Sequence, residues 1–149
     1  EYVAGEPVKP DFLTQQGDIL VRLSAPYTSV IIHEPECGYV IPSHFAIIRV
    51  DKALAIPEYV VWVLKRNSTM KTIEQNTSGS TAFGTISSGF ISNLKIRDIP
   101  IDKQKVIGQL QLLSEKEQKL LTELAFEKQK YNRAAIDKIY DSCKRGKEI

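Results

Sequence analysis

The sequence has little cysteine, no long apolar run and no strong charge of one sign. Its two cysteines, Cys37 and Cys143, show no CxxC spacing, so no disulfide scaffold is expected and a reducing, cytoplasmic setting is indicated. No apolar run reaches the length of a membrane span, and no signal peptide opens the chain. A net charge of +2 permits contact with an anion but lacks the basic excess of dedicated nucleic-acid-binding domains.

The motifs of common enzymes are also missing. The sequence has no phosphate-binding GxxxxGK[ST] loop, no GxGxxG and no GxSxG nucleophile turn. A cluster of polar residues allows a metal site but lacks a standard ligand spacing, so polar groups at hairpin edges are the favoured interpretation: His33, Glu34, Glu36, Cys37 and His44. Nothing fixes a base beside Cys37, which disfavours a nucleophile there. An enzyme is therefore disfavoured, and no cofactor or metal is expected.

Short β-branched runs in the first third of the chain predict a small sheet. The runs Asp18–Ser24, Thr28–Glu34 and His44–Val50 are typical of strands, separated by the turn sequences APY and PECGY. Residues 1–17 contain proline and glycine and are expected to be extended or poorly ordered. With an apolar fraction of 42%, the chain can bury a real core.

Helical periodicity begins at Ile56. Pro57 suits the first turn of a helix, and the apolar face that follows ends near Asn67. Ser68 is then predicted to cap a second short helix whose inward residues are Met70 and Ile73.

A further short helix and an edge strand are expected before the last proline. Ser87 or Ser88 is predicted to cap a helical turn that runs through Leu94. The segment KIRDIPI then alternates, which predicts a short edge strand that tolerates Pro100 and buries Ile96, Ile99 and Ile101.

The strongest pattern is a helix from Lys103 to Cys143 that Asp102 caps. At 1.5 Å per residue it would be on the order of 60 Å long, far more than a small domain needs. Apolar residues recur at alternating steps of three and four from Val106 to Leu124, with Glu117 as the one polar member, and the stripe continues more weakly through Tyr131, Ala134 or Ala135, and Ile139. We call six of these the seam residues: Val106, Leu110, Leu113, Leu120, Leu124 and Tyr131. A narrow seam requires a partner helix. Because the chain has only one such helix, that partner is expected to be another chain or a part of a longer parent protein.

The Gly/Ser/Thr stretch before this helix has two interpretations. It is either a plain surface loop or a cradle for an anion, in which backbone N–H groups and hydroxyls approach a phosphate. The second interpretation is supported by nearby positive charge at Lys65, Arg66 and Lys71, and it assigns the contacts to Ser78, Gly79, Ser80 and Thr81.

The turn between the first two predicted strands poses the same choice. Arg22, Ser24, Tyr27 and Thr28 lie at a strand end and a turn. They are either a solvated hairpin tip or a surface that contacts phosphates and base edges, for which arginine, tyrosine and threonine are suited.

In order, these segments resemble one family. LTQQGDILVRLSAPYTSV, PEYVVWVLKRNS and TSGSTAFGTISSGFISNLKIRDIPIDKQKVIGQL look like the specificity subunit of type I restriction–modification enzymes, over roughly Leu13 to Tyr140. The most specific positions are Ser78 to Thr81, Ile86, Ser87, Leu94, Ile99, Pro100, Gln104, Ile107 and Leu110.

The resemblance implies a non-catalytic, DNA-binding role. Members of the family carry two target recognition domains, each followed by a long helix, and the two helices pair antiparallel as a spacer between the halves of a split DNA target. The subunit docks methylation subunits, which carry S-adenosylmethionine, and recruits the restriction subunits.

This sequence departs from the family by holding one unit instead of two, and by lacking a stretch that usually precedes GDIL. The resemblance therefore implies an α+β fold, with a partial recognition domain over 1–101 that contains a small mixed sheet and a coiled-coil-type spacer helix over 102–145. Pairing of this helix with a second copy would give a two-fold homodimer and a palindromic target. The expected partners are double-stranded DNA, methylation subunits and a second copy, with no membrane. The alternative is a truncated interaction protein that pairs with methylation or specificity subunits without reading DNA.

Overall fold

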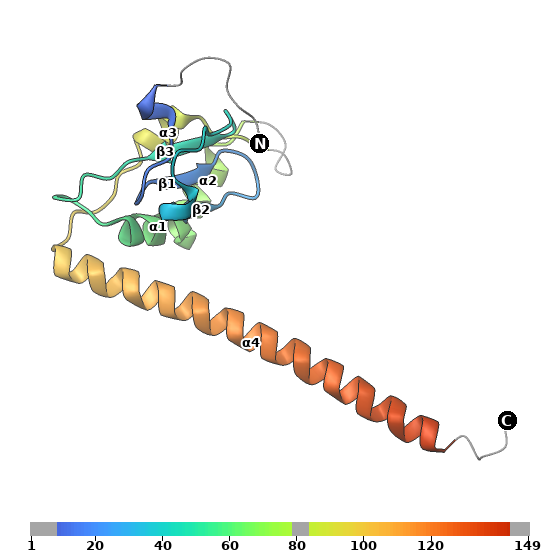
Figure 1. Cartoon of the computed structure of the whole chain (residues 1–149). Helices are drawn as coiled ribbons and strands as arrows, with labels where there is room; N and C mark the ends of the chain where they lie inside the picture. The colour runs from blue at the N-terminus through green and yellow to red at the C-terminus, as the bar shows by residue number, and fades with distance from the viewer. Residues whose placement is uncertain (1–8, 79–83, 144–149) are drawn as a thin grey trace. The chain divides into compact units, whose positions relative to one another are not determined.

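The chain forms two compact units, Glu1–Gln109 and Leu110–Ile149. The computed structural model describes residues 9–78 and 84–143 (Figure 1). Within those ranges no helix has both the length and the apolar character needed to cross a membrane. The α+β class predicted from the sequence is confirmed, because a small sheet with short helices is followed by one long helix.

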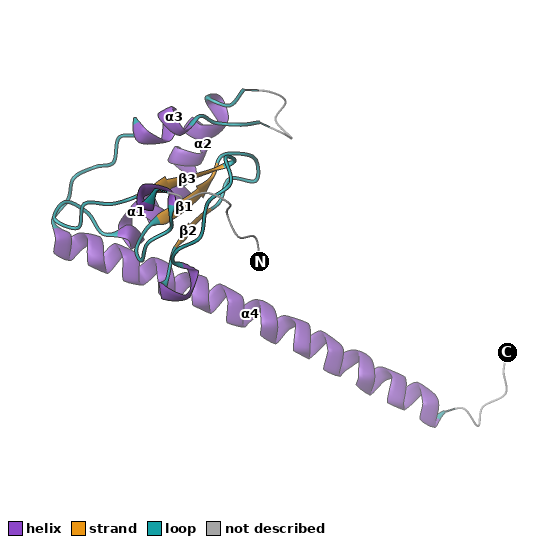
Figure 2. Cartoon of the chain, turned by 45° about the horizontal axis from the view of Figure 1, so that its top comes forward, coloured by secondary structure: helices purple, strands orange, loops and turns teal. Residues whose placement is uncertain are grey.

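The sheet has three strands in the order β2-β1-β3, drawn in orange in Figure 2. Strand β1 spans Ile19–Arg22, β2 spans Ser29–Ile31 and β3 spans Phe45–Ile48. The three predicted strands are confirmed with shorter bounds. Both pairings of β1 are antiparallel, so the described sheet is antiparallel rather than mixed.

The core lies between β1 and the helices that follow the sheet. Helix α1 spans Pro57–Lys65 with Pro57 in its first turn, as predicted, and α2 spans Asn67–Gln75. Ile19 is fully buried. The buried cluster also contains Val21, Val60, Val61, Leu64, Ile73, Ile86 and Ile91.

The start of α2 differs from the prediction. The helix begins at Asn67, directly after Arg66 separates it from α1, so Ser68 lies inside the first turn and is not the cap. The inward face is confirmed, since Ile73 is buried and Met70 packs against the core. The predicted cap of the next helix is also confirmed: the Ser87 side chain accepts a hydrogen bond from the backbone N–H of Phe90 at the start of α3, Ser88–Ser92.

The edge strand predicted around Pro100 is absent from the structure. The backbone carbonyls of this segment accept hydrogen bonds from side chains: the Tyr59 hydroxyl donates to Arg97 and the Gln104 amide donates to Ile99. The apolar alternation instead reflects partial burial, because Ile96 packs against the core cluster without a neighbouring strand.

Two short 3-10 turns, η1 at Pro10–Phe12 and η2 at Glu34–Glu36, flank the sheet. Residues 1–17 were expected to be extended or poorly ordered. Residues 1–8 lie outside the described part of the chain, and Thr14 is only 3% exposed. Its hydroxyl donates to the carbonyl of Glu36 at 2.6 Å and accepts from the N–H of Tyr39 at 3.0 Å. These bonds fix the segment around Thr14 against η2.

An ion pair between the buried Asp18 and the partly exposed Arg49 fixes the start of β1. Asp18 is 2% exposed and accepts two hydrogen bonds from the Arg49 guanidinium, at 2.9 and 2.8 Å, and one from the N–H of Gln15. Burial acts to raise the pKa of Asp18, but the bonds from Arg49 and Gln15 outweigh it and hold the pKa below its usual value.

Helix α4 spans Ile101–Ser142 and contains 42 residues. It begins one residue before the predicted cap: the Pro100 carbonyl accepts from Lys103 and Gln104, and Asp102 lies in the first turn, where a negative charge suits the helix dipole. The first turns, through Gln109, belong to the globular unit.

One side chain joins α4 to that unit. Gln104 is 1% exposed, its amide oxygen accepts from the N–H of Ile56 at 3.0 Å, and its amide nitrogen donates to the carbonyls of Leu54 and Ile99. A turn later, buried Gly108 faces the side chain of Glu58. Both residues lie on the side of the helix opposite the seam, by helical spacing.

Candidate functional site

Segments far apart in the sequence meet at the end of the sheet where β1 ends, β2 begins and β3 begins. The chain continues past β1, and Ser24 pairs with Thr85, which itself pairs with Ser78. The N–H of Ile86 also donates to the carbonyl of Leu23 at 2.9 Å. The predicted turn and the two described ends of the Gly/Ser/Thr stretch therefore lie side by side. We call this region the polar end of the sheet.

Arg22 is the cation of this region on β1. It is half-buried, and its Nε donates to the Ser24 hydroxyl at 3.2 Å. Because Val21 is buried in the core and strand side chains alternate, Arg22 belongs to the other face of the sheet. Its backbone N–H donates to the carbonyl of Thr28 at 2.9 Å, which places Thr28, an exposed residue, across the turn.

Tyr27 holds residues 84–86 in place beside the end of β1. Its hydroxyl donates to the carbonyl of Gly84 at 2.8 Å, and the N–H of Ala25 donates to the same carbonyl at 3.2 Å. A Cβ added at Gly84 would lie 3.0 Å from the Tyr27 oxygen and from the Thr77 Cβ. Tyr27 is thus a positioning residue, and glycine is the residue that fits beside it.

The remaining predicted contact residues divide between two places. Ser78 is exposed and lies in this region through its pairing with Thr85. Lys71 is exposed on α2, the helix that leads into the Gly/Ser/Thr stretch. Gly79, Ser80 and Thr81 lie outside the described residues, so their predicted contacts remain predictions.

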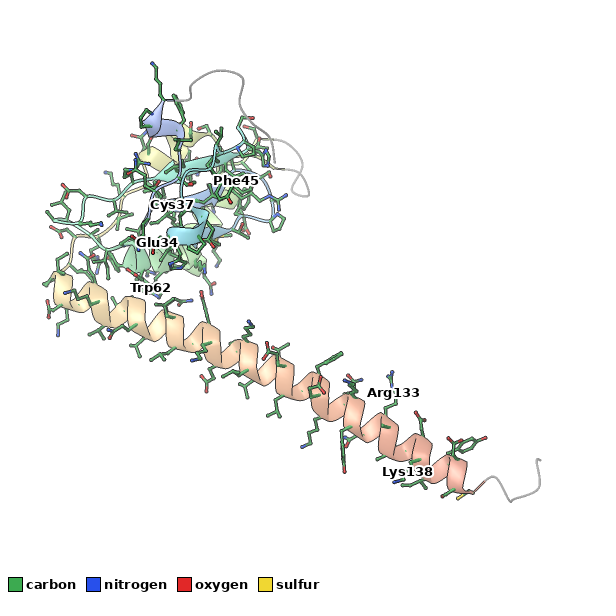
Figure 3. The ribbon with its side chains drawn as sticks, in the orientation of Figure 1. Glu34, Cys37, Phe45, Trp62, Arg133 and Lys138 are labelled. Carbon is green, nitrogen blue, oxygen red and sulfur yellow. The ribbon has the colours of Figure 1, made fainter. Side chains whose placement is uncertain are left out.

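The structure adds two aromatic residues that the sequence did not indicate. Phe45 pairs with Arg22 across the sheet, and the carbonyl of exposed His44 accepts from the N–H of Leu23 at 2.9 Å. The two rings contact each other with centroids 4.6 Å apart, and Phe45 is labelled in Figure 3. Their position depends on β3 pairing with β1 rather than with β2, and no local pattern carries that information.

The cluster considered for a metal has a local structural role instead. The N–H of His33 donates to the Glu36 carboxylate at 3.0 Å, and the Cys37 thiol donates to the carbonyl of His33 at 3.4 Å. These groups close the η2 turn. Within residues 9–78 and 84–143 no group of three His, Cys, Asp or Glu side chains is placed to hold a metal ion.

An apolar pocket lies beside Gln104 in the globular unit, lined among others by Ile48, Val50, Leu54 and Tyr59. The amide oxygen of Gln104 and its amide nitrogen are both engaged with the backbone. The pocket is mostly apolar, and the Gln104 side chain that lines it is already bonded to the backbone.

The second candidate surface is the seam of α4. Every seam residue is more than half exposed, from 52% at Val106 to 74% at Tyr131. A shallow groove runs along the middle of the seam and is lined by Leu110, Leu113, Leu120, Leu121 and Leu124, with Glu117, Ser114 and Lys116 beside them. Figure 3 labels two charged residues, Arg133 and Lys138, farther along the helix toward its C-terminal end. Contiguous apolar surface of this kind indicates an interaction site.

Comparison with known proteins finds no relative of the chain among protein families or curated proteins.

Proposed function

We propose that the chain is a DNA-binding specificity component of a type I restriction–modification system, as the order of its motifs suggests. The observation that supports the proposal most is the pairing of Ser24 with Thr85 and of Thr85 with Ser78. It joins the two segments selected independently from the sequence into one polar surface, with Arg22 and Thr28 beside them.

The residue types of this surface suit a DNA backbone. Most hydrogen bonds from proteins to DNA go to phosphate and sugar, and arginine, serine, threonine and backbone N–H groups are common donors. Under the proposal, Arg22 and Thr28 contact DNA from the turn, Ser78 and the stretch after it contact phosphate, and Lys71 adds charge. Ser24 and Tyr27 hold the turn and residues 84–86 in register.

The proposal gives α4 a separate role. Its exposed seam pairs with the α4 of a second copy, in the antiparallel manner that the resemblance implies, and the dimer addresses a split, palindromic target. Methylation subunits dock on this assembly and supply the chemistry, while the chain itself is not an enzyme and binds no cofactor.

Sedimentation equilibrium of the full chain with a fluorescent random-sequence duplex, at low and at moderate salt, tests the proposal. A dimer whose DNA affinity falls steeply with salt is expected. Arg22→Ala and Lys71→Ala should each weaken binding to all sequences and reduce the salt slope by about one.

Lys52→Ala is the matched control. Lys52 is exposed and follows β3 at its far end, while Arg22 pairs with Phe45 at the near end. It should keep the wild-type affinity and slope. If all three variants bind as the wild type does, the polar end of the sheet does not contact DNA.

A second candidate is an interaction protein that does not read DNA. The net charge is only +2, which gives little general electrostatic attraction to DNA. This candidate predicts that the wild type captures a methylation subunit yet shows no salt-dependent duplex binding. Leu120→Asp should then abolish capture, and Arg22→Ala should leave it unchanged.

A further inference from the structure

We propose that two copies of α4 pair in one particular antiparallel register, in which Lys116 of each copy lies opposite Glu123 of the other. The inference rests on the proposed function insofar as that function requires α4 to pair with itself. It goes further by naming the alignment, which the resemblance does not provide.

The surface available for pairing extends along nearly the whole helix. The seam repeats every three and four residues from Val106 to Tyr131, and a strict continuation of this spacing places Ala134 and Lys138 at the next positions. Val106 is 52% exposed although it belongs to the turns that pack in the globular unit, because Gln104 and Gly108 occupy the other side of the helix there. A second helix can therefore contact the seam from its first turns onward.

Charged residues within the seam disfavour a parallel dimer. The repeat places Glu117, Glu127 and Lys138 at seam positions. In a parallel pair in register, each seam residue faces the same residue of the other helix. Glu117 would then face Glu117, Glu127 would face Glu127, and Lys138 would face Lys138. Like charges at close range in a seam with little water are unfavourable. An antiparallel pair avoids this, because each such residue then faces a different seam position of the other helix.

The residues that flank the seam restrict the antiparallel register. The residue just before each alternate seam position is Gln109 at the first position and is charged at the later ones, where the sign changes at every heptad: Lys116, Glu123, Lys130 and Asp137. In an antiparallel pair these flanking positions face one another. Lys116 is therefore matched by Glu123 or by Asp137 of the other copy, whereas the intermediate alignment places it against Lys130 and places Glu123 against itself.

The length of the helix selects between the remaining alignments. If Lys116 faced Asp137, Val106 would lie level with positions beyond Ser142, where the described helix ends. If Lys116 faced Lys116, Tyr131 would lie beyond Ile101 of the other copy, where α4 begins. With Lys116 opposite Glu123, every seam residue from Val106 to Tyr131 faces α4 of the second copy.

This alignment also gives favourable layers within the seam. Leu113 faces Leu124 of the second copy, Val106 faces Tyr131, and Glu117 faces Leu120 rather than another carboxylate. Each layer thus contains at least one apolar residue.

Reversal of the two charges, separately and together, tests the register by sedimentation equilibrium of the full chain at low salt. Lys116→Glu should weaken the dimer, because it replaces two attractive contacts with two repulsive ones, and Glu123→Lys should do the same. Each is expected to raise the dissociation constant roughly tenfold. The double variant Lys116→Glu/Glu123→Lys exchanges the signs across the same contact, so its dissociation constant should return to within about threefold of the wild type.

A matched control separates the contact between the two copies from an ion pair within one helix. Glu123 also forms an ion pair with Lys119 of the same helix at 3.9 Å. Lys119→Glu breaks that pair on the outward face and should leave the dimer as strong as the wild type. Circular dichroism of each variant checks that α4 keeps its helicity.

The other outcomes overturn the register. With Lys116 opposite Asp137, the double variant would bind more weakly than either single variant. In a parallel dimer, the Glu123→Lys defect would persist in the double variant, since Glu123 would face Lys128. In the alignment of Lys116 with Lys130, Lys116→Glu would strengthen the dimer. A wild type that is monomeric at all concentrations would instead contradict the self-pairing in the proposed function, and with it any register.

Discussion

Gly108 of α4 and Glu58 of α1 approach each other so closely that a Cβ added at Gly108 would lie 2.6 Å from the Glu58 Cβ. Real Cβ atoms do not come so near to another carbon, and the contacting atom is held close to the α1 backbone rather than at the end of a flexible side chain. The close approach is therefore possible only because position 108 has no side chain.

Gly108→Ala should consequently destabilise the globular unit. In an exposed helix the same change stabilises by about 1 kcal/mol, because alanine has the higher helix propensity. Here the backbone of α4 must move away from α1, which disturbs the bonds of nearby Gln104. Urea unfolding should show a lower midpoint for this variant. Gly89→Ala in α3, where the nearest atom would lie 3.8 Å away, is the control and should unfold at or above the wild-type midpoint.

Gln104→Ala should reduce the free energy of unfolding by about 2–4 kcal/mol, because it leaves the N–H of Ile56 and the carbonyls of Leu54 and Ile99 without their side-chain partner. Chemical denaturation measures this loss. Gln104→Glu retains an acceptor for Ile56 but removes both donated bonds, so it should not restore stability. A loss no greater than that of Gln111→Ala, at a position of α4 whose amide bonds only to Glu115, would contradict the role assigned to Gln104.

The ion pair between Asp18 and Arg49 should make stability depend on acidity. The pKa of Asp18 in the folded chain lies below its usual value of 3.8. The group therefore stabilises the fold above about pH 4, and this contribution is lost as the pH falls through the lowered pKa. Asp18→Asn should be less stable than the wild type near pH 7, and the difference should shrink toward about pH 2. Urea unfolding across that range measures it, and a difference that stays constant would be inconsistent with the lowered pKa.

Leu120→Asp should convert the dimer into monomers, because each substitution places a charge in the seam of both copies and removes an apolar contact worth roughly 1.5–3 kcal/mol. Sedimentation equilibrium reports the result. Phe126→Asp is the matched control, since Phe126 is 64% exposed on the face of α4 away from the seam. If Phe126→Asp dissociates the dimer and Leu120→Asp does not, the pairing face has been misplaced.

Local patterns were sufficient to predict most of the elements. Helices α1 and α4 follow from apolar periodicity over many residues, and the strands follow from β-branched runs bounded by turns. The edge strand around Pro100 was predicted wrongly because alternation records which residues are buried, not what bonds the backbone. There the Tyr59 hydroxyl and the Gln104 amide take the place of a neighbouring strand.

The contacts that organise the candidate site could not be predicted in the same way. Composition selected the turn at Arg22 and the stretch at Ser78, but their meeting through Thr85 joins segments far apart in the chain. His44 was considered as a metal ligand or, in the favoured interpretation, as a polar group at a hairpin edge, and nothing near it in the sequence indicates that β3 pairs beside β1. Gln104 was recognised as a motif position, and glutamine is a residue usually found exposed, so its burial was not foreseen.

The contacts of Gln104 have a consequence for how α4 forms. Starting a helix is the unfavourable step, because the first turn orders several residues for a single hydrogen bond, whereas each later residue adds a bond of its own. The globular unit orders the first turn of α4 through its own packing and so provides the nucleus, from which the exposed length can propagate without a tertiary core. Fraying is then confined to the far end, and slow amide exchange should fade gradually along the helix toward Ser142 rather than from both ends.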